Sequence, residues 1–356
     1  MNTHKIQSES ELKDVLNGWA ALHSSVGQSP FTDPGFFEAW WDNYGRCDKR
    51  ALLNITIGLS GGRLVALAPL VVVRRCGFRF LEWAGANVFD YQDLLLEDHA
   101  DKRFFWEAIR DSRTYDLAFM RSIGPNAASY EFLSEAARPA RSSTGYSLAL
   151  EWNSEQDWMK NALSRSRRQQ LRRKRRLLQE RGDLNFQVHS SGSIPTAVFE
   201  SLLQQKLDWA VTGRKGGLFG DPDKAMPLLR RLARAAQESG TLHLSWLSCD
   251  NAIIAAHFGF LHHNKLHYYI PSYSREWREF SPGDVLLSCL IGWCIDNNVS
   301  ALDFMKGDHG YKLSYANERT ELVDFLFPGS IIGGIAEWAL RNLYFCSPLF
   351  LFAFSP

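Results

Sequence analysis

Apolar residues recur along the chain with two different periods, and the change of period marks the expected elements. Aromatic and β-branched residues form three short stretches, at 241–247, 252–261 and 266–270, divided by polar turns. Such stretches are typical of strands joined by hairpins. At 286–294 the apolar residues instead return every three or four positions, which predicts one face of a helix. A strand is expected at 301–305, so a helical crossover links two parallel strands.

The first half of the chain mixes helices and strands in the same way, so we expect an α/β protein with a mixed sheet. The patterns predict helices at 9–22, 36–44 and 103–112, and strands at 52–58, 64–73, 78–83 and 115–120. Segment 138–143 is the best candidate for a boundary, because Arg, Pro and Ser are typical of links. We therefore expect two domains, 1–140 and 141–327, followed by an apolar C-terminal tail at 328–356.

Composition and charge exclude several classes of protein. The 356 residues are 45% hydrophobic, which is ample for packed cores, and the net charge of +1 gives no overall case for DNA binding. The six cysteines form no C-x-x-C pair and no Cys/His cluster has ligand spacing, so we expect reduced thiols and no metal. The polar residues 1–14 do not resemble a signal peptide, and no apolar run is long enough to span a membrane. We expect a cytoplasmic protein.

The segment Ser281-Pro282-Gly283-Asp284 has the features of a helix start. Ser281 is a capping residue, Pro282 suits the first helical position, and Asp284 favours the positive end of the helix dipole. Free N–H groups at such a start bind phosphate, and Gly283 would let a ligand approach the backbone. The plain alternative is a well-formed helix N-terminus without a ligand, and the four residues leave both open.

A second notable segment, 165–176, carries eight cations and no acid, which leaves the rest of the chain with a net charge of −7. Leu163, Leu171 and Leu178 share one face, so the helix can dock by that stripe and direct its arginines outward. A solvated face, an anion site for phosphates or an acidic glycan, and a contact to RNA or membrane are the alternatives. We predict the anion site.

Two further segments are candidates for substrate contact. Asp90 and Tyr91 precede an apolar strand, where they face a cleft or form a solvated turn. The helix expected at 199–211 carries Trp209 and leads into the basic, glycine-rich loop 213–217, which either closes over an anionic ligand or is only a loop.

The order of these motifs resembles the CelD-like acetyltransferase family of the GNAT superfamily. The residues that carry the resemblance are Ser281, Pro282, Gly283, Asp303, Phe304, Gly307, Asp308, Tyr311 and Lys312. The segment FFEAWWDNYG and the arginine-rich helix extend it over most of the chain. The usual GNAT phosphate loop is absent, which puts the cofactor site in doubt.

The resemblance implies a tandem GNAT-like fold and an acyltransferase of exopolysaccharide or cellulose biosynthesis. The donor would be acetyl-CoA or another acyl-CoA, without a metal, and the acceptor an amine or hydroxyl of a sugar or exopolysaccharide precursor. A backbone N–H near the central strand would polarise the thioester carbonyl. There are two alternatives. One is a FemAB-like transferase that uses aminoacyl-tRNA, in which the arginine-rich helix would contact RNA. The other is a non-catalytic scaffold in a polysaccharide-synthesis complex.

Such chemistry needs a base for the acceptor and an acid for the thiolate. The catalytic candidates are Asp308 and Tyr269, with Lys312 beside them. The predicted cofactor-binding residues are Ser281, Gly283, Asp284, Arg168 and Arg172, and the predicted substrate-binding residues are Asp90, Tyr91, Trp209, Asp303 and Tyr311.

The chain ends in a bare apolar run at 348–354. Three roles are open for this run: it completes a core, it forms a partner interface, or it lies on the surface of a membrane such as the inner membrane. It is too short to span a membrane. We expect it to pack on protein.

Overall fold

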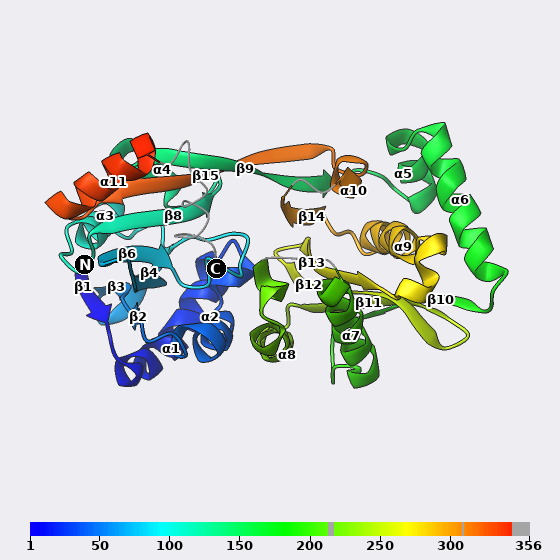
Figure 1. Ribbon diagram of the computed structural model, residues 1–356, viewed down its shortest axis with the longest axis horizontal. Coiled ribbons are helices and arrows are strands. Elements are labelled where there is room, and N and C mark those ends of the chain that lie inside the picture. The colour runs from blue at the N-terminus through cyan, green and yellow to red at the C-terminus, as the bar shows by residue number, and fades with distance from the viewer. Residues whose placement is uncertain (213–216, 308–309, 344–356) are drawn as a thin grey trace. The chain divides into compact units, whose positions relative to one another are not determined.

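The computed structural model describes residues 1–212, 217–307 and 310–343 (Figure 1). The chain forms two compact units, Met1–Ser143 with Thr320–Pro356, and Thr144–Arg319. The second unit is therefore inserted between two parts of the first. Asp308, loop residues 213–216 and the apolar run at 348–354 lie outside the described residues.

The first unit combines two groups of strands with helices. Its helices are α1 (Glu9–Val26), α2 (Pro34–Trp40), α3 (Lys102–Arg110), α4 (Tyr130–Ala136) and α11 (Ile331–Leu343). Its strands are β1 (Asn2–Ile6), β2 (Ala51–Leu53), β3 (Ile55–Ser60), β4 (Arg63–Ala68), β5 (Leu70–Arg75), β6 (Phe78–Trp83), β7 (Leu95–Leu96), β8 (Leu117–Ile123) and β15 (Glu318–Pro328), which begins just before the unit boundary. They are ordered β1-β3-β4-β7 and β15-β8-β6-β5-β2. The prediction of a single strand at 64–73 is wrong. Pro69 divides this segment into β4 and β5, which belong to different sheets.

Aromatic side chains fill the core of the first unit. Tyr115 and Trp106 both pack edge-on against Phe327, with ring centres 5.9 and 5.5 Å apart. Phe327 belongs to β15, which pairs antiparallel with β8 in the register Phe325↔Met120. The core of this unit thus needs a strand that comes about two hundred residues after its neighbour. On α11, by contrast, Ile331, Ile332, Ile335 and Trp338 are all exposed.

The second unit is a sheet with helices on both faces (Figure 1). Its helices are α5 (Glu155–Ala162), α6 (Arg165–Gln179), α7 (Thr196–Thr212), α8 (Pro222–Glu238), α9 (Pro282–Asp296) and the short α10 (Gly310–Leu313). Its strands follow the order β10 (Leu184–His189), β11 (Leu242–Cys249), β12 (Ala252–His262), β13 (Lys265–Tyr273), β14 (Ala301–Lys306) and β9 (Arg138–Ala149), which enters from the first unit. The predicted hairpins, crossover helix and final strand are confirmed.

Several other strands differ from the sequence prediction. The strand predicted at 52–58 is divided between β2 and β3, which belong to different sheets. Segment 138–143, expected as a link, is the first half of β9. Strands β1, β10 and β15 were not predicted at all. The alternation of Leu184, Phe186 and Val188 was a usable signal for β10, since alternate residues of a strand share one face.

Opposite faces of the sheet in the second unit bury different residues. Tyr268 of β13 belongs to the cluster formed by Leu287, Leu290 and Cys294 of α9. On α7, Phe199 packs edge-on against Phe258 of β12, with ring centres 5.4 Å apart. The neighbouring Tyr269 contacts that same Phe258 ring.

Helix α6 docks by two of the three predicted leucines, Leu171 and Leu178, which are at most 3% exposed. Leu163 is buried too, but it lies before the helix, at the end of α5. The cations therefore occupy the remaining surface of the helix. Over the described residues, no helix combines the length and apolar character needed to cross a membrane.

Candidate functional site

Strands β13 and β14 run parallel but pair over a short length only. Their ladder runs from Lys265↔Ala301 to His267↔Asp303. Strand β13 continues to Tyr273 and β14 to Lys306, with no pairing between these ends. The facing main-chain groups of the two ends are thus not hydrogen-bonded to one another.

A β-bulge lies at the same point of β13. On its other side, β13 pairs with β12 in the register Phe258↔Ile270 and then Phe260↔His267. Two residues, Tyr268 and Tyr269, therefore lie opposite the single Gly259. A bulge removes one N–H from the regular ladder and re-aims it. The bulge, which the sequence did not reveal, lies at the point of β13 where the ladder to β14 stops.

The helix that links these strands, α9, begins with a left-handed residue. Ser281 has φ 51° and ψ 54° and its side chain makes no capping hydrogen bond, so the predicted side-chain cap is wrong. Pro282 and Asp284 do occupy the first turn. At Gly283, a Cβ atom would have only a Tyr273 ring carbon within 4 Å, at 3.7 Å. The fold itself therefore does not require glycine there.

Two cations of α6 bind the carboxylate of Asp284. Arg167 Nη2 donates to Oδ1 at 2.9 Å and Lys174 Nζ donates to Oδ2 at 2.5 Å. Arg167 also donates to the Tyr315 hydroxyl at 3.0 Å and lies over that ring. Burial is the main cause of the raised pKa of Tyr315, so its phenol is neutral. This network ties α6 to the start of α9 and carries one more positive than negative charge.

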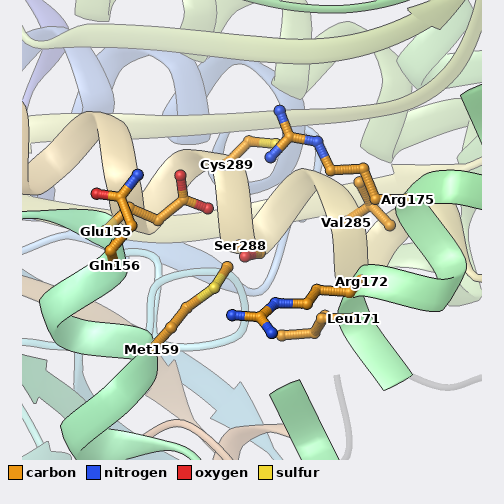
Figure 2. A pocket seen from close by; sticks show the side chains of 9 residues that line it. All are labelled: Glu155, Gln156, Met159, Leu171, Arg172, Arg175, Val285, Ser288 and Cys289. Atoms are coloured by element: carbon orange, nitrogen blue, oxygen red, sulfur yellow. The ribbon is translucent and has the colours of Figure 1, made fainter. Parts of the chain in front are cut away.

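The two arginines predicted to bind cofactor have different surroundings. Arg168 Nη1 donates to the carbonyl oxygens of Lys160 and Leu163, at 2.9 and 2.5 Å, and so caps the end of α5. Arg172 is exposed and lines a pocket between α5, α6 and α9 (Figure 2). A cofactor-binding role stays a prediction for both.

The end of β14 gathers three of the other candidates. Lys312, which is 3% exposed, donates to the carbonyl oxygens of Met305 and Lys306 at 3.2 and 2.7 Å. Asp303 is buried and accepts a 2.7 Å hydrogen bond from the Met305 N–H. Tyr311 packs edge-on against Phe304, with ring centres 6.4 Å apart. These contacts fix the main chain just before Asp308.

Beside Asp303 lies a buried histidine. His267 Nδ1 is 3.8 Å from Asp303 Oδ2. Burial lowers the pKa of His267 to about 3, so this imidazole is neutral near pH 7. The two side chains therefore do not form an ion pair.

The remaining candidates lie elsewhere. Trp209 is on α7, where Lys206 Nζ lies 4.8 Å from the centre of its ring. Asp90 and Tyr91 belong to the first unit, with the Tyr91 ring 6.4 Å from that of Phe31. Nearby Asp93 accepts hydrogen bonds from the N–H groups of Ala128 and Ser129, and burial raises its pKa to about 6.

The fold is the tandem GNAT-like α/β class predicted from the sequence. Residues 165–313, less than half of the chain, match the family model described as "Acetyltransferase (GNAT) domain", and this match indicates an acyltransferase. This match covers α6 to α10, and so includes β13, β14 and the helix α9 between them. Within the described residues, no group of His, Cys, Asp and Glu is arranged to hold a metal ion.

Solved structures share the fold over nearly the whole chain. The crystal structure of FemX is 10% identical with a TM-score of 0.61, covering 95% of this chain and 100% of the other. The C-terminal domain of a putative lysylphosphatidylglycerol synthetase from Agrobacterium fabrum is 11% identical with a TM-score of 0.56, covering 94% and 96%. A protein of unknown function from Bacteroides thetaiotaomicron is 12% identical with a TM-score of 0.54, covering 92% and 100%. No curated protein matches the sequence.

Proposed function

We propose that the protein transfers an acyl group from acyl-CoA to the amine or hydroxyl of a sugar or exopolysaccharide precursor. The observation that carries the proposal is the unpaired end of β13, where the ladder to β14 stops at His267. Amide groups of an extended ligand can pair with such main-chain groups, as an added strand does. The pantetheine arm of coenzyme A contains amides of this kind.

The bulge supports the chemical step. An N–H released from the ladder at Tyr268 or Tyr269 would donate to the thioester carbonyl oxygen as negative charge develops on it. Such a donor is most effective when the fold holds it rigidly. The close approach of the β12 and β13 backbones at Gly259 provides that rigidity.

The start of α9 supports binding of the donor's phosphates. This helix has 15 residues; Pro282 has no N–H and the Asp284 N–H donates to the Ser281 carbonyl oxygen at 3.1 Å, so the N–H of Gly283 is the donor proposed to face a phosphate. The two positive charges of Arg167 and Lys174 exceed the single negative charge of Asp284, so the net charge of this region remains positive. Gly283 leaves space for a phosphate beside the backbone.

In the transfer itself, the acceptor nitrogen or oxygen attacks the thioester carbonyl carbon while a base removes its proton. The carbon–sulfur bond then breaks, and an acid protonates the thiolate. We assign the base to Asp308 and the acid to Tyr269. Lys312 positions the main chain that leads into Asp308, through the carbonyl groups of Met305 and Lys306.

The acceptor is proposed from the CelD-like resemblance, and Trp209 is the residue of the second unit best suited to it. Its partly buried ring, flanked by Lys206, offers an apolar face and a cation side by side. Sugars present apolar C–H faces together with hydroxyl groups, which suits such a surface.

Calorimetric titration with acetyl-CoA tests the donor. The unaltered protein should bind, and Gly283→Val should weaken binding at least about 10-fold without lowering the melting temperature. Gly334→Val is the matched control, because a Cβ there meets no atom within 4 Å and a Cβ at Gly283 meets only one, at 3.7 Å. Failure of the unaltered protein to bind acetyl-CoA would overturn the proposal.

A FemAB-like transferase that uses aminoacyl-tRNA is the second candidate. The TM-score of 0.61 to FemX favours it, as does the exposure of Arg165, Arg173 and Arg176 on α6. A gel-shift experiment with tRNA separates the two candidates. A salt-sensitive shift without acetyl-CoA binding would favour the tRNA-dependent enzyme.

A further inference from the structure

Helices α5, α6 and α9 enclose a pocket of about 180 Å³ within the second unit (Figure 2). Its volume is below the roughly 300–1,000 Å³ of pockets for drug-sized ligands, so it suits a smaller molecule. Glu155 and Met159 line it from α5, Arg172 and Arg175 from α6, and Val285 and Ser288 from α9.

The pocket is separate from the region proposed for the donor. Ser288 lines the pocket, whereas Leu290 of the same helix belongs to the cluster that contains Tyr268 of β13. Residues two apart on a helix point about 200° from one another. The thickness of α9 thus lies between the pocket and the sheet.

One side of the pocket is cationic, and over the described residues it forms no ion pair with the Glu155 carboxyl group on the other side, although Arg175 and Glu155 interact electrostatically. Arg172 and Arg175 are three positions apart on α6, and both are exposed. Over the described residues, neither has an acidic group within ion-pair distance, whereas Arg167 and Lys174 are both paired to Asp284. Like charges at this spacing repel, and an anion between them would relieve the repulsion. Guanidinium groups are well suited to a carboxylate.

The opposite side carries a carboxyl group that is held in place. A Cβ atom on Gly292 would lie 3.2 Å from Glu155 Cδ, so the Glu155 side chain packs against the backbone of α9. Its Oε1 is buried and accepts no hydrogen bond from the described residues. Burial also raises the pKa of Glu155, although the charge of Arg175 and a hydrogen bond with Ser288 act in the opposite direction. A cation in the pocket would offset the cost of burying this charge.

We propose that the pocket binds a free α-amino acid with an apolar side chain. Its carboxylate would face Arg172 and Arg175, its ammonium group would face Glu155, and its side chain would contact Met159 and Val285. The two charges of a zwitterion match the two sides of the pocket, which a simple anion or cation does not. The size of the pocket suits such a ligand.

Calorimetric titration of the full-length protein with L-leucine, N-acetyl-L-leucine and L-leucinamide tests the two charges separately. Leucine should bind, and both derivatives should bind at least about 10-fold more weakly, because each lacks one charge. Equal binding of leucine and N-acetyl-leucine would show a plain anion site and overturn the proposal. Absence of binding by leucine, methionine and phenylalanine would overturn it as well.

Variants then locate the site. Glu155→Gln should remove the preference for leucine over N-acetyl-leucine, and the double variant Arg172→Gln/Arg175→Gln should weaken leucine binding at least about 10-fold. The double variant Arg165→Gln/Arg173→Gln is the matched control, since it also removes two charges from the same helix but outside the pocket. Circular dichroism confirms that each variant is folded. Equal loss of binding in the control would show a general charge effect and contradict the assignment.

Discussion

The backbone of Gly259 approaches the carbonyl oxygen of His267 so closely that a Cβ atom at residue 259 would lie 2.1 Å from it. No real Cβ contact is that short. The glycine therefore permits the bulge of β13, and through it the donor proposed to polarise the thioester.

Replacing Gly259 should lower the stability of the folded protein. We expect Gly259→Ala to lower the free energy of unfolding by about 1–3 kcal/mol, because β13 must shift or the core must be overpacked. Urea unfolding measures this cost. The control, Gly283→Ala, adds the same methyl group where the nearest atom is 3.7 Å away, and should change stability little. Equal stability of the two variants would show that the strands accommodate the methyl group.

The ion pair between Lys174 and Asp284 should be worth more than an ordinary surface pair. The side chains of Lys174 and Asp284 are only 24% and 18% exposed. A double-mutant cycle with Lys174→Gln and Asp284→Asn should give a coupling energy of about 1–3 kcal/mol, measured by urea unfolding. The exposed pair Arg176–Glu180 of α6 provides the comparison, with about 0.5 kcal/mol or less expected. Similar coupling in both cycles would contradict the role of Asp284 as an anchor.

The folded protein should lose stability as the pH falls below about 6.5. His243, His257 and His267 are at most 3% exposed, and burial lowers their pKa, to about 3 for His243 and His267. Above pH 6.5 each is neutral in both states, whereas at lower pH only the unfolded chain takes up protons. Each histidine should reduce the free energy of unfolding by about 1.4 kcal/mol per pH unit.

A substitution isolates one of these groups. His243→Leu should make the fall in stability between pH 6.5 and 5 shallower by about 1.4 kcal/mol per unit, whatever its effect on packing at pH 7.5. Urea unfolding across this range measures the slope. His4→Leu, at an exposed position, is the control and should leave the slope close to that of the unaltered protein. An unchanged slope in His243→Leu would mean that this imidazole is protonated in the folded state.

Tyr269 should affect turnover more than folding. If its hydroxyl protonates the departing thiolate, Tyr269→Phe should lower kcat by about 10² to 10⁴ while the melting temperature stays the same. Release of coenzyme A from acetyl-CoA, followed with a thiol reagent, measures the rate. Tyr130→Phe removes a hydroxyl from the first unit and should leave turnover unchanged. Near-normal turnover in Tyr269→Phe would remove this residue from the mechanism.

Local patterns predicted the parts of the fold that depend on neighbouring residues. The buried face of α6, formed by Leu171 and Leu178, and the apolar face of α9 follow from helical spacing alone. Strand β15 could not be found in this way, because its partner β8 lies about two hundred residues earlier and its own first half is polar.

The site was predictable to a smaller extent. The position of Gly283 and Asp284 at a helix start follows from local sequence, but the partners of Asp284 on α6 are 110 and 117 residues away. Ser281 failed as a cap because its backbone is left-handed, which a single serine does not reveal. Gly259 was the local sign of the bulge. A single glycine does not reveal a bulge unless the register between β12 and β13 is known.

The insertion of the second unit into the first has a consequence for synthesis on the ribosome. Strand β8 lies between β6 and β15 in the sheet. Strand β6 is translated before β8, whereas nearly all of β15 is translated only after the second unit. Until then, β8 leaves the ribosome with a bare apolar edge, which invites pairing with other chains. Slowing translation after residue 123 should therefore promote aggregation of the nascent chain, whereas the second unit has all its own residues by position 319.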